Sequence, residues 1–87
     1  MNLHEFENDW RNMGQLDYLY GKKFKYMNYL DAVIITNREH EHCEFCWETI
    51  SSHLDAINVG YCTDNLYRWV CPNCFNELKQ LFHWEVV

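Results

Sequence analysis

Two pairs of cysteines, each with two residues between its members, place the strongest constraint on how this chain can fold. One pair is Cys43 and Cys46, the other is Cys71 and Cys74, and 24 residues lie between the pairs. A two-residue spacing lets a tight turn direct both sulfur atoms to one point, and four thiolates can complete a tetrahedral metal site. The interval exceeds the roughly 15–20 residues usual for this pattern, which leaves room for a hairpin. The spacing predicts that these four cysteines hold one structural metal ion.

Zinc is the expected cofactor, because closed sites of four thiolates are typical of structural zinc. Iron is the alternative, since Cys71-Pro72-Asn73-Cys74 is similar to a rubredoxin knuckle. The residues that follow the two pairs are Trp47 and Phe75, where the rubredoxin family has glycine. This difference favours zinc over iron.

The length of 87 residues predicts a single domain over residues 1–87. A hydrophobic core of this size contributes only about 3–5 kcal/mol. Structural zinc binds with an apparent free energy of roughly 10–16 kcal/mol. We therefore expect that removal of zinc unfolds at least the C-terminal half of the chain.

The use of cysteine also bears on the cellular compartment. The first ten residues contain neither the basic segment nor the apolar segment of a secretory signal. No stretch approaches the ~20 apolar residues that span a bilayer. We expect a cytoplasmic location without membrane contact, in which thiols stay reduced and five cysteines point to metal or redox chemistry rather than to disulfides.

Cys62 is the fifth cysteine and belongs to neither pair. It lies in Gly60-Tyr61-Cys62-Thr63, within an alternating pattern that predicts a strand. We expect a small buried apolar side chain at this position. A metal ligand or a reactive thiol is the alternative.

In the N-terminal half, apolar residues recur at intervals of three and four, which predicts a helix over about residues 3–13. These residues are Leu3, Phe6, Trp10 and Met13. Asn2 followed by Glu5 resembles a capping box, and Gly14 suits the end of the helix. Further along, the β-branched run over residues 31–36 predicts a buried strand.

In the C-terminal half, alternating residues predict two strands, over 57–62 and 66–70, joined by a turn. Pro72 suits the first turn of a helix, which the apolar spacing extends over about 72–83. The apolar positions of this helix are Phe75, Leu78, Leu81 and Phe82. We expect Trp84 and the tail Val86-Val87 to pack back on the domain.

The fold class that follows is α+β: an N-terminal helix, a short antiparallel sheet or hairpin, and a C-terminal helix that begins at the second cysteine pair. Over residues 40–84 this order resembles the treble-clef zinc finger. The resemblance implies that Cys43 and Cys46 form the knuckle and that Cys71 and Cys74 open the helix. A zinc ribbon is the alternative, and the helical pattern after Cys74 counts against it. The motifs around the cysteines also look like those of small bacterial proteins of uncharacterised function.

Two histidines precede the first pair and raise the question of a second metal site. His40 and His42 alternate, so they would share one face of an extended chain. Glu39, Glu41 or Glu44 would have to complete such a site. A solvent-exposed polar loop is the favoured interpretation. A histidine could instead replace one of the cysteines, or donate a hydrogen bond to a thiolate.

The net charge of −6 disfavours nucleic acid as the partner. Lys22, Lys23 and Lys25 form the one basic cluster. They lie among aromatic residues, a pattern that can bind single-stranded nucleic acid. The aromatic residues are Tyr18, Tyr20, Phe24, Tyr26 and Tyr29. A solvated strand edge or turn is the favoured interpretation of this cluster. Nucleic-acid binding stays an alternative, because it would need the lysines and arginines to gather on one face.

Protein–protein interaction is the expected role, with zinc as a structural element. Aromatic residues are 17% of the chain, more than so small a core can hide, and exposed Trp and Tyr anchor interfaces. The residues concerned are Trp10, Tyr18, Trp47, Tyr67, Trp69 and Trp84. The acidic surface would attract a basic protein.

We expect no enzymatic activity, because four sulfur ligands leave no open position on the metal. The chain contains no H-E-x-x-H motif, and no H-x-E in the deaminase arrangement relative to P-C-x-x-C. A thiol-based redox or metal sensor is a further hypothesis, in which oxidation of the thiolates ejects the metal.

Overall fold

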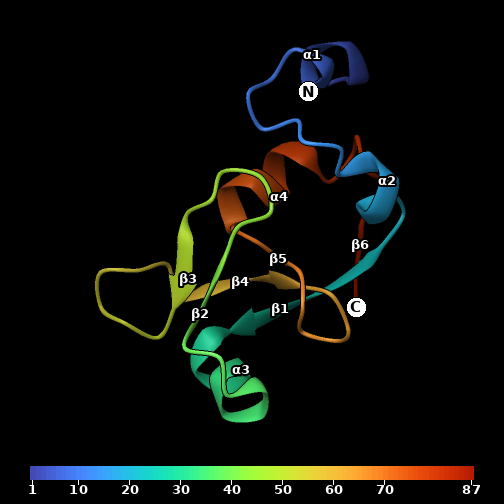
Figure 1. Cartoon of the computed structure of the whole chain (residues 1–87). Helices are drawn as coiled ribbons and strands as arrows, with labels where there is room; N and C mark the ends of the chain where they lie inside the picture. Colours follow the sequence, from blue (N-terminus) through green and yellow to red (C-terminus); the bar gives the residue numbers. More distant parts are fainter.

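A computed structural model describes residues 1–87 and contains four short helices and six short strands. The elements are α1 (Leu3–Glu7), α2 (Leu16–Leu19), β1 (Lys23–Asn28), α3 (Tyr29–Thr36), β2 (His40–His42), β3 (Thr49–Ser51), β4 (Val59–Cys62), β5 (Trp69–Val70), α4 (Pro72–Leu78) and β6 (Glu85–Val86). They form a small α+β domain in which the sheet lies in the middle, α1 at one end and α3 at the other (Figure 1).

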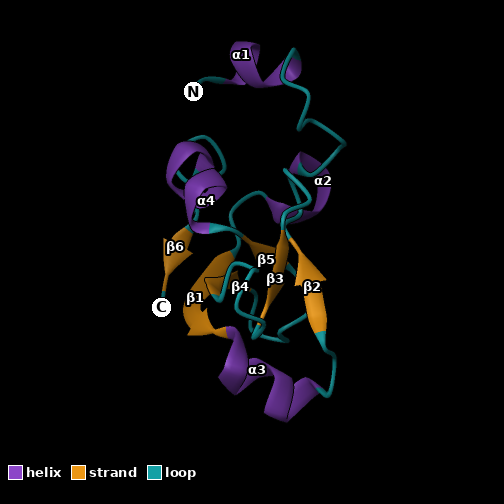
Figure 2. Cartoon of the chain, turned by 90° about the vertical axis from the view of Figure 1, so that its left-hand side faces the viewer, coloured by secondary structure: helices purple, strands orange, loops and turns teal.

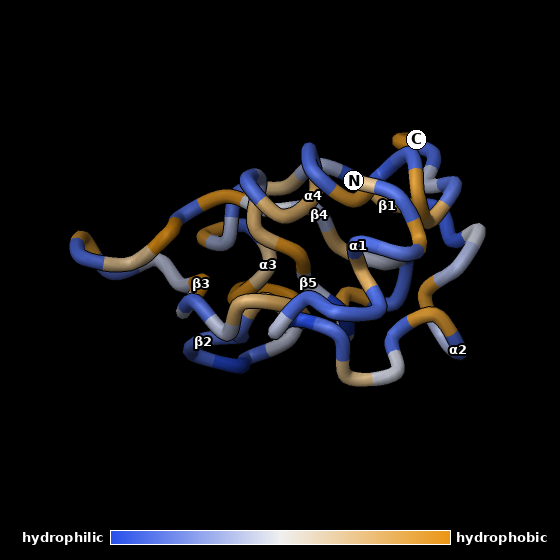
Figure 3. The backbone as a smooth tube through the Cα atoms, turned by 90° about the horizontal axis from the view of Figure 1, so that it is seen from above, coloured by the Kyte–Doolittle hydropathy of each residue, from blue (hydrophilic) through white to orange (hydrophobic).

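The central sheet is mixed and has the strand order β5-β4-β1-β6. β1 pairs antiparallel with β4, where Tyr26 lies opposite Tyr61, and parallel with β6, where Lys23 lies opposite Glu85. The hairpin β2–β3 forms a second, two-stranded sheet that lies beside β4 and β5 (Figure 2). In the hydropathy-coloured trace β2 is hydrophilic along its length (Figure 3).

Two of the three clustered lysines lie on an inner strand and not on the strand edge or turn that the sequence favoured, while Lys22 lies in the exposed segment just before that strand. Lys23 and Lys25 belong to β1, which has a neighbouring strand on each side. Alternation keeps Phe24 on the opposite face from these lysines, and Phe24 is fully buried. The basic residues therefore gave no sign that β1 buries its other face in the core through Phe24.

Residues 31–36 are helical, so the prediction of a buried strand was wrong. The side chain of Asn28 accepts a hydrogen bond from the backbone N–H of Leu30 and caps α3, and Asn37 ends it in the left-handed conformation with φ 59°. Tyr29 and Ala32 are buried at helical spacing, whereas Ile34 is 77% exposed. The caps and the contacts of one helix face outweigh the strand preference of the β-branched run.

The N-terminal helix is confirmed but is shorter than predicted, since it ends at Glu7 instead of Met13. The capping box of Asn2 and Glu5 is present in both directions. Asp9 then accepts hydrogen bonds from the backbone N–H and the guanidinium of Arg11. Such local side-chain hydrogen bonds compete with the backbone hydrogen bonds of a helix, so the chain leaves the helical path after Glu7.

The hairpin of β4 and β5 is confirmed, with Tyr61 opposite Val70 and Cys62 opposite Trp69. Its strands are shorter than the predicted 57–62 and 66–70, since they cover only Val59–Cys62 and Trp69–Val70. Gly60 in β4 lies against the tryptophan ring: a Cβ added there would be 3.1 Å from Cε3 of Trp69 and 3.2 Å from the carbonyl oxygen of Val70. A side chain at this position of β4 would therefore press on the neighbouring strand β5.

Aromatic rings form most of the core between α4 and the sheet. Phe75 of α4 stacks on Tyr61 at 3.7 Å between ring centroids and on Trp84 at 5.1 Å. Phe6 of α1 meets Phe82 edge to face, with centroids 5.4 Å apart, and so joins the N-terminal helix to this core. Edge-to-face and stacked pairs of this kind each stabilise by about 0.5–1.5 kcal/mol beyond simple burial.

The C-terminal helix begins at Pro72 as predicted but ends at Leu78 instead of residue 83. His83 adopts the left-handed conformation with φ 55°, and the chain reverses there. Trp84 packs back on the domain, where its indole N–H donates to the carbonyl of Leu19 at 2.8 Å. The tail also packs back on the domain, because its backbone pairs with β1 as strand β6. The side chain of Val86 is nevertheless 55% exposed.

The longest helix, α3, has eight residues, so no helix reaches the length and apolarity that crossing a bilayer requires.

Candidate metal centre

Two separate parts of the fold carry the four paired cysteines. Cys43 and Cys46 lie in the turn between β2 and β3, which we call the knuckle (residues 43–46). Cys71 is the N-cap of α4, and Cys74 lies in its first turn. Cys43 also forms a bridge with Trp69 of β5, and this bridge places the knuckle beside the start of α4.

The four sulfur atoms form one cluster, as the sequence predicted. Each pair of Sγ atoms lies within 4.8 Å, and Sγ of Cys46 is 3.7 Å from Sγ of Cys71. None of these cysteines forms a disulfide. Cys43, Cys71 and Cys74 are buried, and Cys46 is half-buried. This arrangement is able to hold a metal ion.

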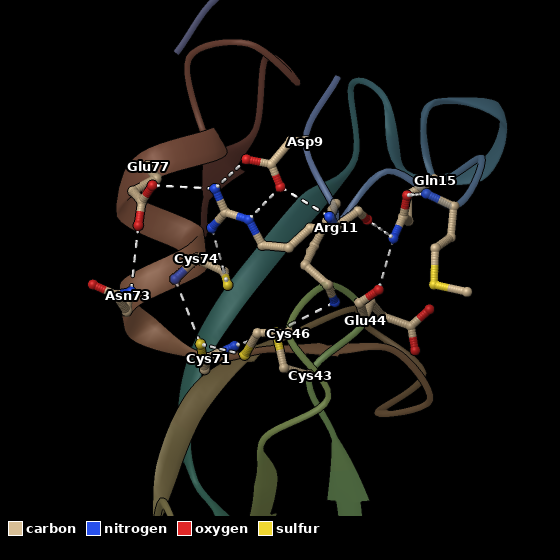
Figure 4. Close-up of polar contacts among 12 residues, drawn as sticks. Asp9, Arg11, Gln15, Cys43, Glu44, Cys46, Cys71, Asn73, Cys74 and Glu77 are labelled. Carbon is tan, nitrogen blue, oxygen red and sulfur yellow. Dashed lines mark hydrogen bonds and ion pairs between the residues drawn. The ribbon is translucent and has the colours of Figure 1, made fainter. Parts of the chain in front are cut away.

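Backbone N–H groups surround the sulfurs. The N–H of Phe45 and the N–H of Cys71 donate to Sγ of Cys43 at 3.5 and 3.3 Å, and the N–H of Cys74 donates to Sγ of Cys71 at 3.5 Å (Figure 4). Hydrogen bonds from backbone amides stabilise a thiolate more than a neutral thiol. The turns that position the sulfurs therefore also favour the ionised ligands that a metal needs.

The sulfurs perturb one another's ionisation. Hydrogen bonds from the side chains of Cys71 and Cys74 lower the pKa of Cys43 to about 2. The hydrogen bond that Cys71 makes to Cys43 raises the pKa of Cys71 to about 12, and the pKa of Cys74 is raised for the same reason. Four negative sulfurs at this separation repel one another, so a divalent cation between them replaces protons as the stabilising charge.

Arg11 is the residue of this centre that the sequence analysis missed. Its buried guanidinium donates from Nη1 to Sγ of Cys74 at 3.5 Å. It also pairs with Asp9 at 2.9 Å and with Glu77 at 3.2 Å (Figure 4). The predicted helix over 3–13 gave Arg11 no role, and no local signal in the sequence links it to a cysteine 63 residues away. Arg11 places a positive charge beside the sulfur cluster, and its hydrogen bond favours the thiolate form of Cys74.

Gln15 holds the same N-terminal segment against the knuckle. Its side chain is fully buried, and its amide nitrogen donates to the carbonyl of Arg11 and to the carbonyl of Glu44, both at 2.8 Å. Its amide oxygen accepts from the backbone N–H of Met13 at 2.7 Å. The segment that carries Arg11 is thus attached directly to the knuckle that carries Cys43 and Cys46.

Cys62 is buried and lies outside the cluster, as expected. Burial raises the pKa of its thiol to about 11, so the sulfur is protonated at neutral pH. These observations support a packing role for Cys62.

His40 and His42 share one face of β2, with ring centroids 5.1 Å apart, but no carboxylate completes a second site. Glu41 pairs with Arg38, and Glu44 pairs with Arg68. The two histidines are exposed as expected, although they lie on a strand and not in a loop. Neither histidine joins the cysteine cluster or bonds to a sulfur.

Comparison with protein-family models, with curated proteins and with solved structures gave no match to this chain.

Proposed function

We propose that the chain is a zinc protein whose four-cysteine site is structural. The distance between the sulfurs carries this proposal. In a tetrahedral zinc site with Zn–S bonds of about 2.3 Å, neighbouring sulfurs lie about 3.8 Å apart. The separation between Cys46 and Cys71 is 3.7 Å, and all the other pairs fall within 4.8 Å.

The surroundings of the site support the treble-clef resemblance. The first pair of cysteines lies in a knuckle, the hairpin β4–β5 follows, and the second pair opens α4. Four sulfur ligands fill a tetrahedral zinc site and leave no position for water or substrate. A non-catalytic role for the metal is therefore part of the proposal.

Metal analysis tests this part. We expect one zinc per chain by elemental analysis and by native mass spectrometry, and loss of the folded state when a strong chelator removes it. Iron in place of zinc would be visible as thiolate-to-iron absorption in the visible range. A chain that stays folded without metal would contradict the structural role.

We further propose that the protein binds a basic protein partner through Trp47. This residue adopts the left-handed conformation with φ 67°, which favours glycine, and its side chain is 58% exposed. Neither backbone geometry nor burial accounts for a tryptophan there, whereas an interface would.

The neighbourhood of Trp47 supports a cationic partner. The ring of His42 lies 6.4 Å from that of Trp47, and His40 lies next to His42. Residues 38–48 contain four glutamates and one arginine. Glu41 and Glu44 are already paired with arginines, whereas Glu39 and Glu48 take part in no ion pair. An exposed indole in this acidic segment suits a Lys or Arg side chain of the partner, which the ring face attracts.

Affinity capture from the source organism tests the partner. We expect basic proteins that elute with salt, are retained by wild type and are lost with Trp47→Gly. Trp10→Gly is the matched control, because Trp10 is 70% exposed and lies outside the acidic segment 38–48. Equal capture by Trp47→Gly and wild type would exclude Trp47 as the anchor.

A further inference from the structure

A surface hollow of about 550 Å³ lies between α2, the start of β1 and the loop that joins β4 to β5. Its wall includes Tyr18, Lys22, Lys23, Asp64, Asn65 and Arg68. A second hollow of about 290 Å³ adjoins it, shares Lys23 and Asp64 with it, and is also lined by Lys25. Pockets of roughly 300–1,000 Å³ are the size that small ligands occupy.

The charge of these hollows is opposite to that of the rest of the molecule. They are lined by four of the seven basic residues of the chain and by one of its thirteen acidic residues. The net charge of the whole chain is −6. More than half of the basic side chains of an acidic chain are therefore gathered at these two hollows.

The donors around the main hollow are largely free. Each arginine of the chain takes part in an ion pair, whereas Lys22 and Lys23 take part in none. Arg68 uses Nη1 on Glu44, and neither of the other two nitrogens of its guanidinium makes a hydrogen bond. The side-chain oxygen of Asn65 accepts two hydrogen bonds within its turn, which leaves its amide nitrogen as a free donor.

The arginine and the asparagine are also held in place before any ligand arrives. The guanidinium of Arg68 lies over the ring of Tyr18 at 4.6 Å and over the ring of Tyr67 at 4.9 Å. The two bonds to its oxygen fix the side chain of Asn65. Groups fixed in advance lose little conformational entropy when they bind a ligand.

The geometry points to a binding site for a small phosphate-bearing molecule in this hollow. Two ammonium groups, one guanidinium and one amide match the charge and the terminal oxygens of a phosphate dianion. A long polyanion would extend beyond the hollow along a molecule whose net charge is −6, and this disfavours nucleic acid. None of the four paired cysteines lines the hollows, and the main hollow meets the knuckle only where Tyr18 and Arg68 bind Glu44. The site does not depend on the proposed protein partner.

Titration of the metal-loaded protein with inorganic pyrophosphate and with ADP at low salt, followed by amide NMR, tests the site. We expect saturable shifts for Lys22, Lys23, Asn65 and Arg68. The double variant Lys22→Gln/Lys23→Gln should weaken binding by at least about tenfold. Lys79→Gln is the matched control, since Lys79 is exposed and lies outside both hollows, and it should change binding by less than about twofold.

Equal zinc content in all variants shows that the fold is intact, so that weakened binding reports on the hollow alone. Pyrophosphate binding without ADP binding, or the reverse, identifies the source of the phosphate and supports the site in either case. The inference is overturned by the absence of saturable shifts with both probes or by equal weakening in Lys79→Gln. It is also overturned if a single-stranded oligodeoxythymidine binds more tightly than ADP.

Discussion

Nη1 of Arg11 donates a hydrogen bond to Sγ of Cys74 over 3.5 Å, and this contact joins the N-terminal segment to the cysteine cluster. Asp9 and Glu77 hold the guanidinium from the other side. The Arg11 hydrogen bond also holds the pKa of Asp9 below its usual range. The N-terminal segment that carries Asp9 and Arg11 thus packs directly against the metal centre.

Replacing Arg11 should loosen the metal. We expect Arg11→Met to weaken zinc binding by roughly 10–100-fold, because residues that support a metal ligand have effects of this size. The rate of zinc transfer to a chromophoric chelator measures the change. Arg11→Lys should restore part of the retention because it keeps the charge.

Arg68→Met is the control for this experiment, since Arg68 pairs with Glu44 and contacts no sulfur. If Arg11→Met and Arg68→Met release zinc at the same rate, Arg11 has no role at the site.

Loss of Gln15 should detach the N-terminal segment from the knuckle. We expect Gln15→Leu to lower the free energy of unfolding by at least about 2 kcal/mol, because buried backbone groups lose their partners. Denaturant unfolding of the metal-loaded protein measures the effect. Gln80→Leu, at an exposed position, should stay within about 0.5 kcal/mol of wild type. Similar losses in both variants would contradict the attachment.

The cysteines should divide into two classes. We expect Cys74→Ser to lose stoichiometric zinc and the folded state, because three sulfurs cannot close the site. Cys62→Ala should keep its zinc and lose only about 1–2 kcal/mol of stability, from a small cavity. Elemental analysis combined with thermal melting distinguishes them, and zinc loss from Cys62→Ala would make Cys62 a ligand.

The burial that raises the pKa of Cys62 to about 11 should make this thiol unreactive. A raised pKa leaves only about one thousandth of the thiol ionised at pH 8, and the thiolate is the form that iodoacetamide attacks. We expect the folded, metal-loaded protein to resist alkylation at Cys62 and the denatured protein to react promptly, as measured by mass spectrometry of peptides. Alkylation at equal rates in both states would mean that Cys62 is accessible.

Gly60 should not tolerate even a methyl group. We expect Gly60→Ala to cost about 1–3 kcal/mol, because the new Cβ would press on the Trp69 ring and on a backbone carbonyl. Gly14→Ala is the matched control: it has φ +86° and no neighbour within 4 Å, so its cost of about 1–2 kcal/mol is backbone strain alone. Near-ultraviolet circular dichroism should change only in Gly60→Ala, where the buried indole has to move.

Local patterns in the sequence were enough to predict several parts of this fold. The capping box at Asn2, the start of α4 at Pro72 and the hairpin before Cys71 all depend on residues that are neighbours in the chain. The convergence of the four cysteines was also predictable, because their spacing reflects the geometry of a turn around one ion.

Tertiary contacts decided the remainder. The β-branched run became α3 because Tyr29 and Ala32 are buried on one face of that helix, and the lysine-rich segment became an inner strand because β4 and β6 pair with it on either side. Arg11 reaches Cys74 only after the chain has folded over 63 intervening residues. Spacing along the chain encodes turns and caps, whereas strand pairing and the approach of a distant side chain depend on the energy of contacts that no local pattern records.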